Sequence, residues 1–357
     1  MYHPTIRGTY YDMGLKYGTV LYKHGFRVTE QPAEKLEFGK KSEKEVRRVF
    51  PEILEEIKGF AEGCHAQYEH LAAFMMSIGA FKAEPMCSAF AAASGSDVVI
   101  GRNYDFFYSF KKFTESYLTL PEGGYTSLGH SDVFIGREDG INEKSLAIAI
   151  TGVHGKTEKP GVSFCLATRA TLDKCANVQE AVRLLTDTRP TAAFNFLLAD
   201  KEGGMAVVEA SPDRTRVRKP EKDESFVFCT NHFVHPEMQE MENLEGRKAS
   251  NWDTLPRYAT MQNALKEHND KTTVKHAQEI LSNHTGYVCS HQEKIKLGTL
   301  WSIVATLKEP KILRAEGQPC RTRYKQDLRL NKAIKKNVIL TENKEKKQRH
   351  QQGTRQV

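Results

Sequence analysis

The spacing of apolar residues predicts a mainly helical opening to the chain. A short helix is expected over residues 12–24, although two glycines weaken it. Ser42 and Glu45 have the spacing of a capping box, which predicts the start of an amphipathic helix at this point. Pro51 should kink or restart that helix, and residues 68–82 show another helical pattern.

The pattern changes around Met86, where short runs rich in β-forming residues begin. Predicted strands cover Asp97–Arg102, Ser116–Leu120, Asp132–Ile135, Ser145–Thr151, Phe194–Asp200, Met205–Ala210, Ser225–Thr230 and Thr299–Leu307. Predicted helices follow a capping box at Asn177 and Glu180 and cover Leu255–His268 and Val274–Ser282. Strands and helices cluster without strict alternation. This favours an α+β fold of antiparallel sheets layered with helices over a doubly wound parallel sheet.

Composition and cysteine usage narrow the class of protein. The chain has 357 residues, of which 39% are hydrophobic and 27% charged, as expected for a globular protein. No run approaches 18 apolar residues, and the N-terminus lacks the apolar stretch of a secretory signal. The seven cysteines include no CxxC pair. We therefore expect no membrane association, reduced thiols and a cytoplasmic location.

The positive charge is concentrated in the last 27 residues. The segment 331–357 holds eight Lys or Arg and two Glu, whereas the whole chain has a net charge of only +7. No aromatic residue lies between these charges, so the segment lacks the stacking groups of a nucleic-acid site. We expect a disordered basic tail and no nucleic-acid partner.

Familiar cofactor and metal motifs are absent from the sequence. The 13 histidines are scattered along the chain. His232 and His235 are three residues apart and could share one face, but no acidic or thiolate residue at ligand spacing would complete a metal site with them. Gly203-Gly204 is too short for a phosphate-binding loop and is typical of a hairpin turn. The sequence therefore predicts no metal and no cofactor.

The stretch from Cys87 to Phe106 carries the most informative chemistry. A cysteine opens the first strand region, and Arg102 and Asp105 follow one hairpin later. In adjacent antiparallel strands these side chains could all meet, and a guanidinium would favour a thiolate. A cysteine in a strand is, however, usually a small buried hydrophobe. From the residues alone both interpretations of Cys87 stay open.

Several ordered motifs resemble a known family. They are Gly101-Arg102-Asn103-Tyr104-Asp105-Phe106, Gly140-Ile141-Asn142-Glu143-Lys144-Ser145-Leu146, Thr230-Asn231-His232-Phe233 and Gly298-Thr299-Leu300-Trp301-Ser302-Ile303. The chain up to about residue 315 resembles the N-terminal-nucleophile hydrolases of the penicillin acyltransferase-like family (acyl-CoA:6-aminopenicillanic acid acyltransferase, peptidase C45). It resembles the choloylglycine hydrolases more distantly.

This resemblance implies a fold and a self-processing enzyme. The expected fold is a four-layer αββα sandwich of two antiparallel sheets between helical layers. The Met86–Cys87 bond would be cut by the Cys87 thiol, which turns an inactive zymogen into two chains. Residues 1–86 would form a helical small subunit or pro-segment, retained as a subunit, and 87–330 the catalytic part. Cys87 would then carry a free α-amine, with a pKa of about 7.7–8.0, as its own general base.

The resemblance also assigns roles to individual residues. Cys87 would be the nucleophile, Asp105 would hold its α-amine, and Arg102 would support the pocket electrostatically. Asn231 would donate its amide to the oxyanion, a contact worth roughly 3 kcal/mol. Arg102 and Asp105 could instead pair only with each other, and Asn231 could form a strand-end turn.

Three further positions are expected to bind substrate, and two of them depart from the family pattern. Tyr104 lies in the motif around Asp105, Thr151 stands where the choloylglycine hydrolases place a second asparagine, and Lys296 replaces an arginine. Lysine keeps the charge but loses the bidentate fork. Another departure is Met86, which precedes the nucleophile where relatives tend to carry glycine.

The sequence thus favours a cysteine amide hydrolase or acyltransferase with a small-molecule acyl amide or acyl-CoA substrate. Water or an amine would accept the acyl group, and a homo-oligomer is possible. The alternatives are a binding or scaffold protein of the same fold that leaves Met86–Cys87 intact, and a nucleic-acid-associated protein that uses the basic tail.

Overall fold

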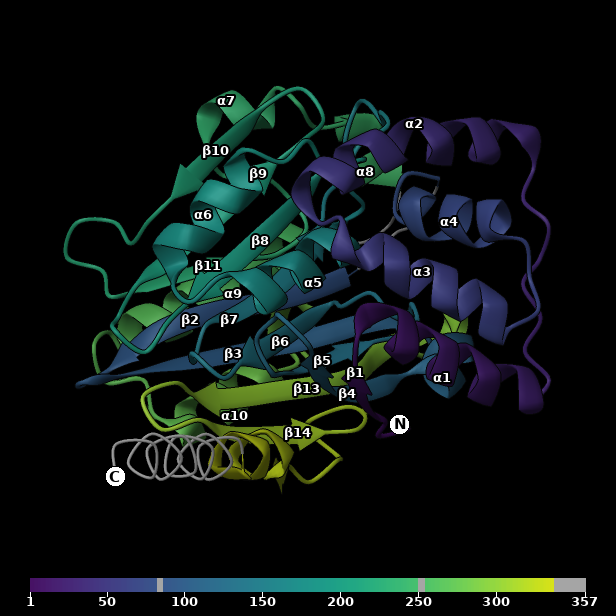
Figure 1. Cartoon of the computed structure of the whole chain (residues 1–357). Helices are drawn as coiled ribbons and strands as arrows, with labels where there is room; N and C mark the ends of the chain where they lie inside the picture. Colours follow the sequence, from purple (N-terminus) through teal and green to yellow (C-terminus); the bar gives the residue numbers. More distant parts are fainter. Residues whose placement is uncertain (82–85, 250–253, 337–357) are drawn as a thin grey trace, which may run out of the picture.

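The computed structural model describes residues 1–81, 86–249 and 254–336 (Figure 1). The helices are α1 (Tyr10–Lys23), α2 (Ala33–Val49), α3 (Glu52–Gly63), α4 (Tyr68–Ser77), α5 (Phe164–Lys174), α6 (Val178–Thr186), α7 (Pro236–Gln239), α8 (Leu244–Ala249), α9 (Thr254–Glu267) and α10 (Val274–Ser282), with 3-10 turns η1 (Tyr108–Phe113), η2 (Thr285–Tyr287) and η3 (Glu293–Ile295). The strands are β1 (Thr5–Gly8), β2 (Met86–Ser94), β3 (Asp97–Phe107), β4 (Glu115–Pro121), β5 (Ser127–Ser131), β6 (Asp139–Asn142), β7 (Ala147–Gly152), β8 (Phe194–Ala199), β9 (Met205–Ala210), β10 (Thr215–Arg218), β11 (Phe226–Cys229), β12 (His291–Gln292), β13 (Leu297–Thr306), β14 (Lys311–Ala315) and β15 (Lys325–Asp327).

The strands form two sheets. The first sheet has the order β1-β4-β5-β6-β7-β8-β9-β10. The second has the order β11-β2-β3-β13-β14-β15, with β12 beside β13. All the named pairs are antiparallel except β1 and β4, which run parallel. The predicted antiparallel sheets are confirmed, with one parallel pair at the edge of the first.

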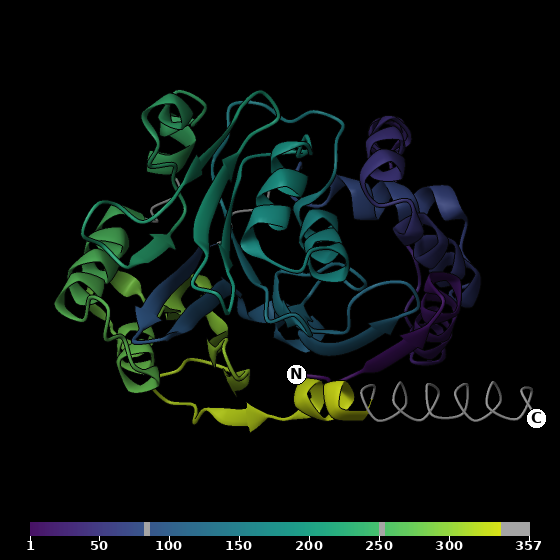
Figure 2. The same ribbon diagram turned by 60° about the vertical axis from the view of Figure 1, so that its left-hand side comes forward.

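Successive side chains along a strand point to opposite faces of its sheet, so each strand contributes to two layers of the core. In β7, Ala147 and Ala149 face the second sheet, whereas Ile148 and Ile150 belong to the core under the helices. In β2, Ala89 faces the first sheet and Phe90 packs under α9 and α10. Figure 2 shows the green helices on one side of the sheets and α1–α4 on the other. The α+β prediction of two sheets between helical layers is confirmed.

The N-terminal helices correct one sequence prediction and confirm another. Helix α2 runs through Ser42, so the predicted capping box there is wrong. The Ser42 side chain is buried, and its hydroxyl oxygen accepts a hydrogen bond from the Gly161 N–H at 3.2 Å. Pro51 does separate two helices, because α2 ends at Val49 and α3 begins at Glu52.

The glycines of α1 have a packing reason. A Cβ on Gly14 would lie 2.0 Å from the backbone oxygen of Glu56 in α3, and one on Gly59 would lie 2.1 Å from that of Tyr11. The two helices therefore touch backbone to backbone, which only glycine permits at these positions. The close contact compensates for the low helix propensity of glycine.

Most predicted strands are confirmed, but the segment 132–135 is not one of them. It forms a turn in which Phe134 has a φ of 54°, a left-handed conformation. Helix α5 was missed because nearly every residue in it is buried, so it lacks an amphipathic stripe. Strands β5 and β6 are short and polar, and they were missed as well.

The basic segment begins with ordered structure. Residues 329–336 are helical, and Ala333 and Ile334 pack against the core between the sheets. The ordered part therefore extends beyond residue 330, and the rest of the predicted tail, 337–357, lies outside the described residues. Within the described residues, no helix combines the length and apolarity needed to cross a membrane.

Candidate active site

Cys87 lies at the beginning of β2, in the face of the second sheet that packs on the first. Its side chain is fully buried, and its cross-strand partner in β3 is Tyr104. The two-residue turn between Ser94 and Asp97 fixes this register, so Arg102 stands opposite Ala89 on the same face. The hairpin therefore brings Arg102 to Cys87, as the sequence indicated.

The guanidinium of Arg102 is held beside the thiol. Its Nη2 lies 3.6 Å from Cys87 Sγ, and its Nη1 donates to Asp139 Oδ2 at 2.8 Å. The indole N–H of Trp301 donates to the same carboxylate oxygen at 3.0 Å. All four side chains are buried. Arg102 is therefore paired with Asp139 and not with Asp105, which excludes one of the alternatives from the sequence.

Burial dominates the ionisation of the Cys87 thiol. It raises the pKa to about 11, while the nearby charge of Arg102 opposes this effect. At neutral pH the thiol is therefore protonated in this structure. A nucleophilic role therefore requires a base next to it.

The backbone of Cys87 is also held by side chains. Its N–H donates to Asn231 Oδ1 at 3.0 Å, and its carbonyl accepts from Arg257 Nη1 at 2.5 Å. Arg257 Nη2 also donates to Asn231 Oδ1, at 2.9 Å. The Asn231 amide group Nδ2 donates to the Gly152 carbonyl at 2.8 Å. Asn231 is thus fixed at both ends of its side chain and lies directly at Cys87.

Arg257 was missed by the sequence analysis. It lies in α9, 170 positions after Cys87, and its side chain is buried. A signal was present, because Arg257, Met261 and Leu265 recur at a spacing of four and are buried together. An arginine on the apolar stripe of a helix indicates a cation that is taken into the core for a specific partner.

Asp105 lies on the opposite face of the sheet from the thiol. It pairs with Met86, so alternation directs it toward α9 and α10 and next to the Met86–Cys87 bond. Thr299 Oγ1 donates to its Oδ1 at 2.6 Å, and its Oδ2 has no hydrogen-bond partner among the described residues. Burial raises the pKa of Asp105 to about 7, with the charge of Arg257 opposing.

The three residues expected to bind substrate have different surroundings. Tyr104 stacks on Trp301 with 3.9 Å between ring centroids. Thr151 is buried, and its hydroxyl donates to the Thr230 carbonyl at 2.5 Å. Lys296 is exposed, with a φ of 56°, and among the described residues it makes no contact with Cys87, Asp105 or Asn231. The structure thus brings Tyr104 and Thr151 close to the site residues but not Lys296.

A cavity of about 260 Å³ lies next to these residues. Tyr104 and Glu138 line it, and Glu138 Oε2 is 3.7 Å from the Arg102 guanidinium. Nearly half of the remaining lining residues are aromatic, namely Phe74, Phe81, Phe106, Phe110, Phe164 and Phe194. Such a wall suits an apolar group with a polar end.

No curated protein matches the chain significantly. Three similar solved structures are a penicillin V acylase, an N-acylethanolamine-hydrolyzing acid amidase ortholog and a conjugated bile acid hydrolase. The acylase, from Agrobacterium tumefaciens, shares 16% identity over 64% of this chain and 83% of its own, with a TM-score of 0.44. The amidase, from Caenorhabditis elegans, shares 17% over 61% and 92%, with a TM-score of 0.45. The bile acid hydrolase, a mutant form of the enzyme from Clostridium perfringens, shares 13% over 68% and 96%, also at 0.45.

A family model provides the assignment. The model of acyl-coenzyme A:6-aminopenicillanic acid acyl-transferase matches residues 92–321. The matched part begins after Cys87 and includes Arg102, Asp105, Asn231 and Arg257. It covers well over half of the sequence. The chain therefore belongs to the acyl-coenzyme A:6-aminopenicillanic acid acyl-transferase family.

Proposed function

We propose that this protein cuts its own Met86–Cys87 bond and then transfers an acyl group through the Cys87 thiol to water or an amine. One observation carries the proposal. The nitrogen, the carbonyl and the thiol of Cys87 are each contacted by a different buried polar side chain, from Asn231, Arg257 and Arg102. A structural cysteine in a strand needs none of these contacts.

The self-cleavage step needs no group from outside the chain except water. The Cys87 thiol attacks the Met86 carbonyl, a thioester forms, and the displaced Cys87 nitrogen takes up the thiol proton. Water then hydrolyses the thioester, which leaves a Met86 carboxylate and restores the thiol. Asp105, next to this bond and with one carboxylate oxygen without a partner among the described residues, would hold the new α-amine.

The acyl-transfer step reuses the same groups. The α-amine accepts the thiol proton as sulfur attacks the substrate carbonyl, and it returns the proton to the leaving group. The acyl chain remains on Cys87 as a thioester until water or an amine releases it. Asn231 would donate to the oxyanion, since its amide is held within reach of the Cys87 backbone.

The aromatic cavity supports an apolar acyl group, either fatty or aryl, as the transferred part. Its wall includes Tyr104, the cross-strand neighbour of Cys87. Phe74 and Phe81 of the N-terminal segment also line it. After cleavage this segment would therefore still contribute to the substrate site.

Buried contacts support retention of the segment as a subunit. Glu56 pairs with Arg169 at 3.1 Å, and both side chains are fully buried. Tyr10 donates to Asp173 at 3.0 Å, and β1 pairs with β4. Separating the two parts would break these buried contacts and expose to water the apolar core that the N-terminal helices share with β7, β8 and α5, which is unfavourable.

Intact mass under denaturing conditions tests the proposal. We expect two chains that meet at Met86 and Cys87 in the wild-type protein and one full-length chain in Cys87→Ala. Incubation of the cut protein with acetyl, octanoyl and phenylacetyl amides and CoA thioesters should add an acyl mass to the Cys87 chain, least for acetyl. An uncut chain that takes up no acyl group would contradict the proposal and favour a binding protein of the same fold.

A further inference from the structure

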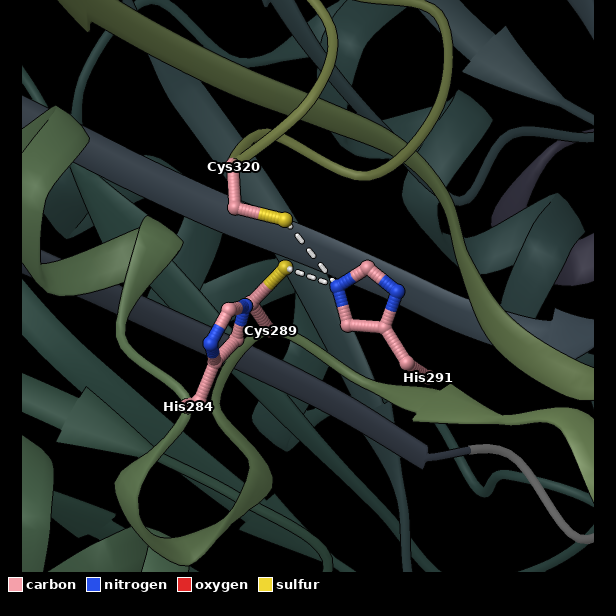
Figure 3. A group of neighbouring side chains, drawn as sticks. All are labelled: His284, Cys289, His291 and Cys320. Carbon is pink, nitrogen blue, oxygen red and sulfur yellow. Dashed lines mark hydrogen bonds between the residues drawn. The ribbon is translucent and has the colours of Figure 1, made fainter.

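Two loops at one end of the second sheet bring four metal-ligating side chains together. His284, Cys289 and His291 come from the segment between α10 and β13, and Cys320 from the loop between β14 and β15. Their ligand atoms all lie within 4.8 Å of one another. Figure 3 shows both sulfur atoms directed at the ring of His291, with His284 on the side of Cys289. Sequence spacing alone did not reveal this set, because Cys320 is far along the chain.

The distances match those of a tetrahedral metal centre. Cys289 Sγ lies 3.4 Å from His291 Nε2, and Cys320 Sγ lies 3.0 Å from the same nitrogen. Zinc binds sulfur at about 2.3 Å and imidazole nitrogen at about 2.0–2.1 Å, so a tetrahedron separates such ligand atoms by about 3.5 Å. The rings of His284 and His291 stand nearly perpendicular, with centroids 5.1 Å apart.

Hydrogen bonding alone explains the arrangement poorly. Two thiols converge on one imidazole nitrogen, which has a single lone pair to offer. A cation at the centre would instead use every ligand atom at once. Two thiolates and two neutral imidazoles around a divalent ion give a neutral site, which suits the partly buried position.

We propose that His284, Cys289, His291 and Cys320 bind one Zn²⁺ ion in a closed structural site. Thiolate and imidazole donors select zinc over magnesium or calcium, which prefer oxygen. Binding displaces the two thiol protons, so the affinity should rise with pH. The four protein ligands complete the coordination, and a reactive open position is therefore not expected.

The site would stiffen the strand that supports Asp105. Cys289 precedes Ser290, whose N–H donates to Thr299 Oγ1 at 3.2 Å, and that hydroxyl donates to Asp105. On the other loop, Gln318 Nε2 donates to Tyr108 OH at 3.1 Å. A metal that ties the two loops together would hold Asp105 in place without touching the substrate.

Metal content of the full-length chain provides the test. Protein expressed with zinc and desalted should contain about one zinc ion per chain by mass spectrometry of the element. The content should fall at least tenfold in Cys320→Ser and in His284→Ala. Cys64→Ser, which changes a buried thiol outside the cluster, and His268→Ala should keep the wild-type content. A wild-type protein without zinc, or cluster variants that retain it, would overturn the proposal.

Cobalt substitution keeps the test decisive if a variant fails to fold. The wild-type chain loaded with Co²⁺ should develop the visible absorption of tetrahedral cobalt and a thiolate-to-metal charge-transfer band. An octahedral spectrum without that band would contradict the assignment. So would an intact mass two hydrogen atoms lower than the reduced chain in the wild type but not in Cys320→Ser, because it would mean that Cys320 is held in a disulfide.

Discussion

Cys87 and Cys165 are both fully buried thiols, yet their neighbours differ. Burial raises both pKa values, to about 11 for Cys87 and to about 12 for Cys165. Cys165 lies near the start of α5 in the core under the helices, where its sulfur is 3.5 Å from the hydroxyl of Ser163. Cys87 has the guanidinium of Arg102 at 3.6 Å. Burial therefore does not distinguish the proposed nucleophile from a core cysteine.

The distinction lies in the polar groups around each cysteine. The N–H and the carbonyl of Cys87 bond to the side chains of Asn231 and Arg257. In a folded core, charged side chains are placed at a backbone only at considerable desolvation cost. Such an arrangement supports the proposed chemistry at Cys87, and the comparison with Cys165 has consequences that can be measured.

The largest effect is expected from removing the Cys87 sulfur. Cys87→Ala should abolish both self-cleavage and acyl transfer, because no other group could carry the acyl chain. Denaturing mass spectrometry measures the first and an amide hydrolysis assay the second. Cys165→Ala is the matched control. It should cut and turn over normally while losing stability through a small cavity. Equal losses of activity in both variants, or normal cleavage in Cys87→Ala, would remove the distinction between the two cysteines.

The second-largest effect is expected from removing the Asn231 amide, which would donate to the oxyanion. Asn231→Ala should lower kcat by roughly 100-fold or more while the chain stays folded, because the variant loses a preorganised donor. Steady-state kinetics on the cut protein and a melting temperature measure this separately. Asn142→Ala is a suitable control, since Asn142 is also buried but donates to the carbonyls of Leu172 and Cys175. If the two variants lose activity only in proportion to stability, Asn231 is a structural residue.

A smaller effect should follow from changing Arg102 to lysine. Arg102→Lys keeps a charge opposite Asp139 but loses the second nitrogen that reaches Cys87 Sγ. We expect a loss of kcat of about tenfold and a slower alkylation of the Cys87 thiol at neutral pH. Arg137→Lys is the control, because Arg137 is also a fully buried arginine but donates to Thr119. This variant should change only the stability of the fold. The same slowing of alkylation in both variants would show that Arg102 has no specific effect on the thiol.

The part of the candidate site that lies in short local motifs was predictable from the sequence. Cys87, Arg102 and Asp105 fall within one hairpin, and Asn231 lies in a short motif beside the neighbouring strand. The alternation between faces was not predicted, because it depends on the two-residue turn after Ser94 that sets the register. Without that register, Arg102 and Asp105 were both expected next to the Cys87 thiol, whereas Asp105 lies on the other face of the sheet.

The other features of the site and fold depend on contacts between residues far apart in the sequence, which the sequence alone did not predict. Arg257 reaches Cys87 from a helix that only the tertiary fold brings to β2, and Cys320 joins the histidine cluster in the same way. Ser42 has the local signature of a helix start, but α2 continues past it because its buried hydroxyl pairs with Gly161. Lys296 aligned with a family arginine, yet the left-handed turn leaves it exposed. In each case a contact distant in sequence or a local turn decided the outcome.

The last effect is on stability and not on turnover, and it concerns the Asp105 carboxylate on the opposite face of the sheet from the thiol. Burial raises the pKa of Asp105 to about 7, compared with about 3.9 in an unfolded chain. Between these values the folded state binds a proton that the unfolded state has lost, so the free energy of unfolding should fall as pH rises from about 4 to 7. In a chain kept uncut by Cys87→Ala, this one group contributes a slope of up to about 1.4 kcal/mol per pH unit. Adding Asp105→Asn should remove that contribution, whereas an unchanged slope in urea titrations at several pH values would mean that Asp105 is already ionised beside Arg257.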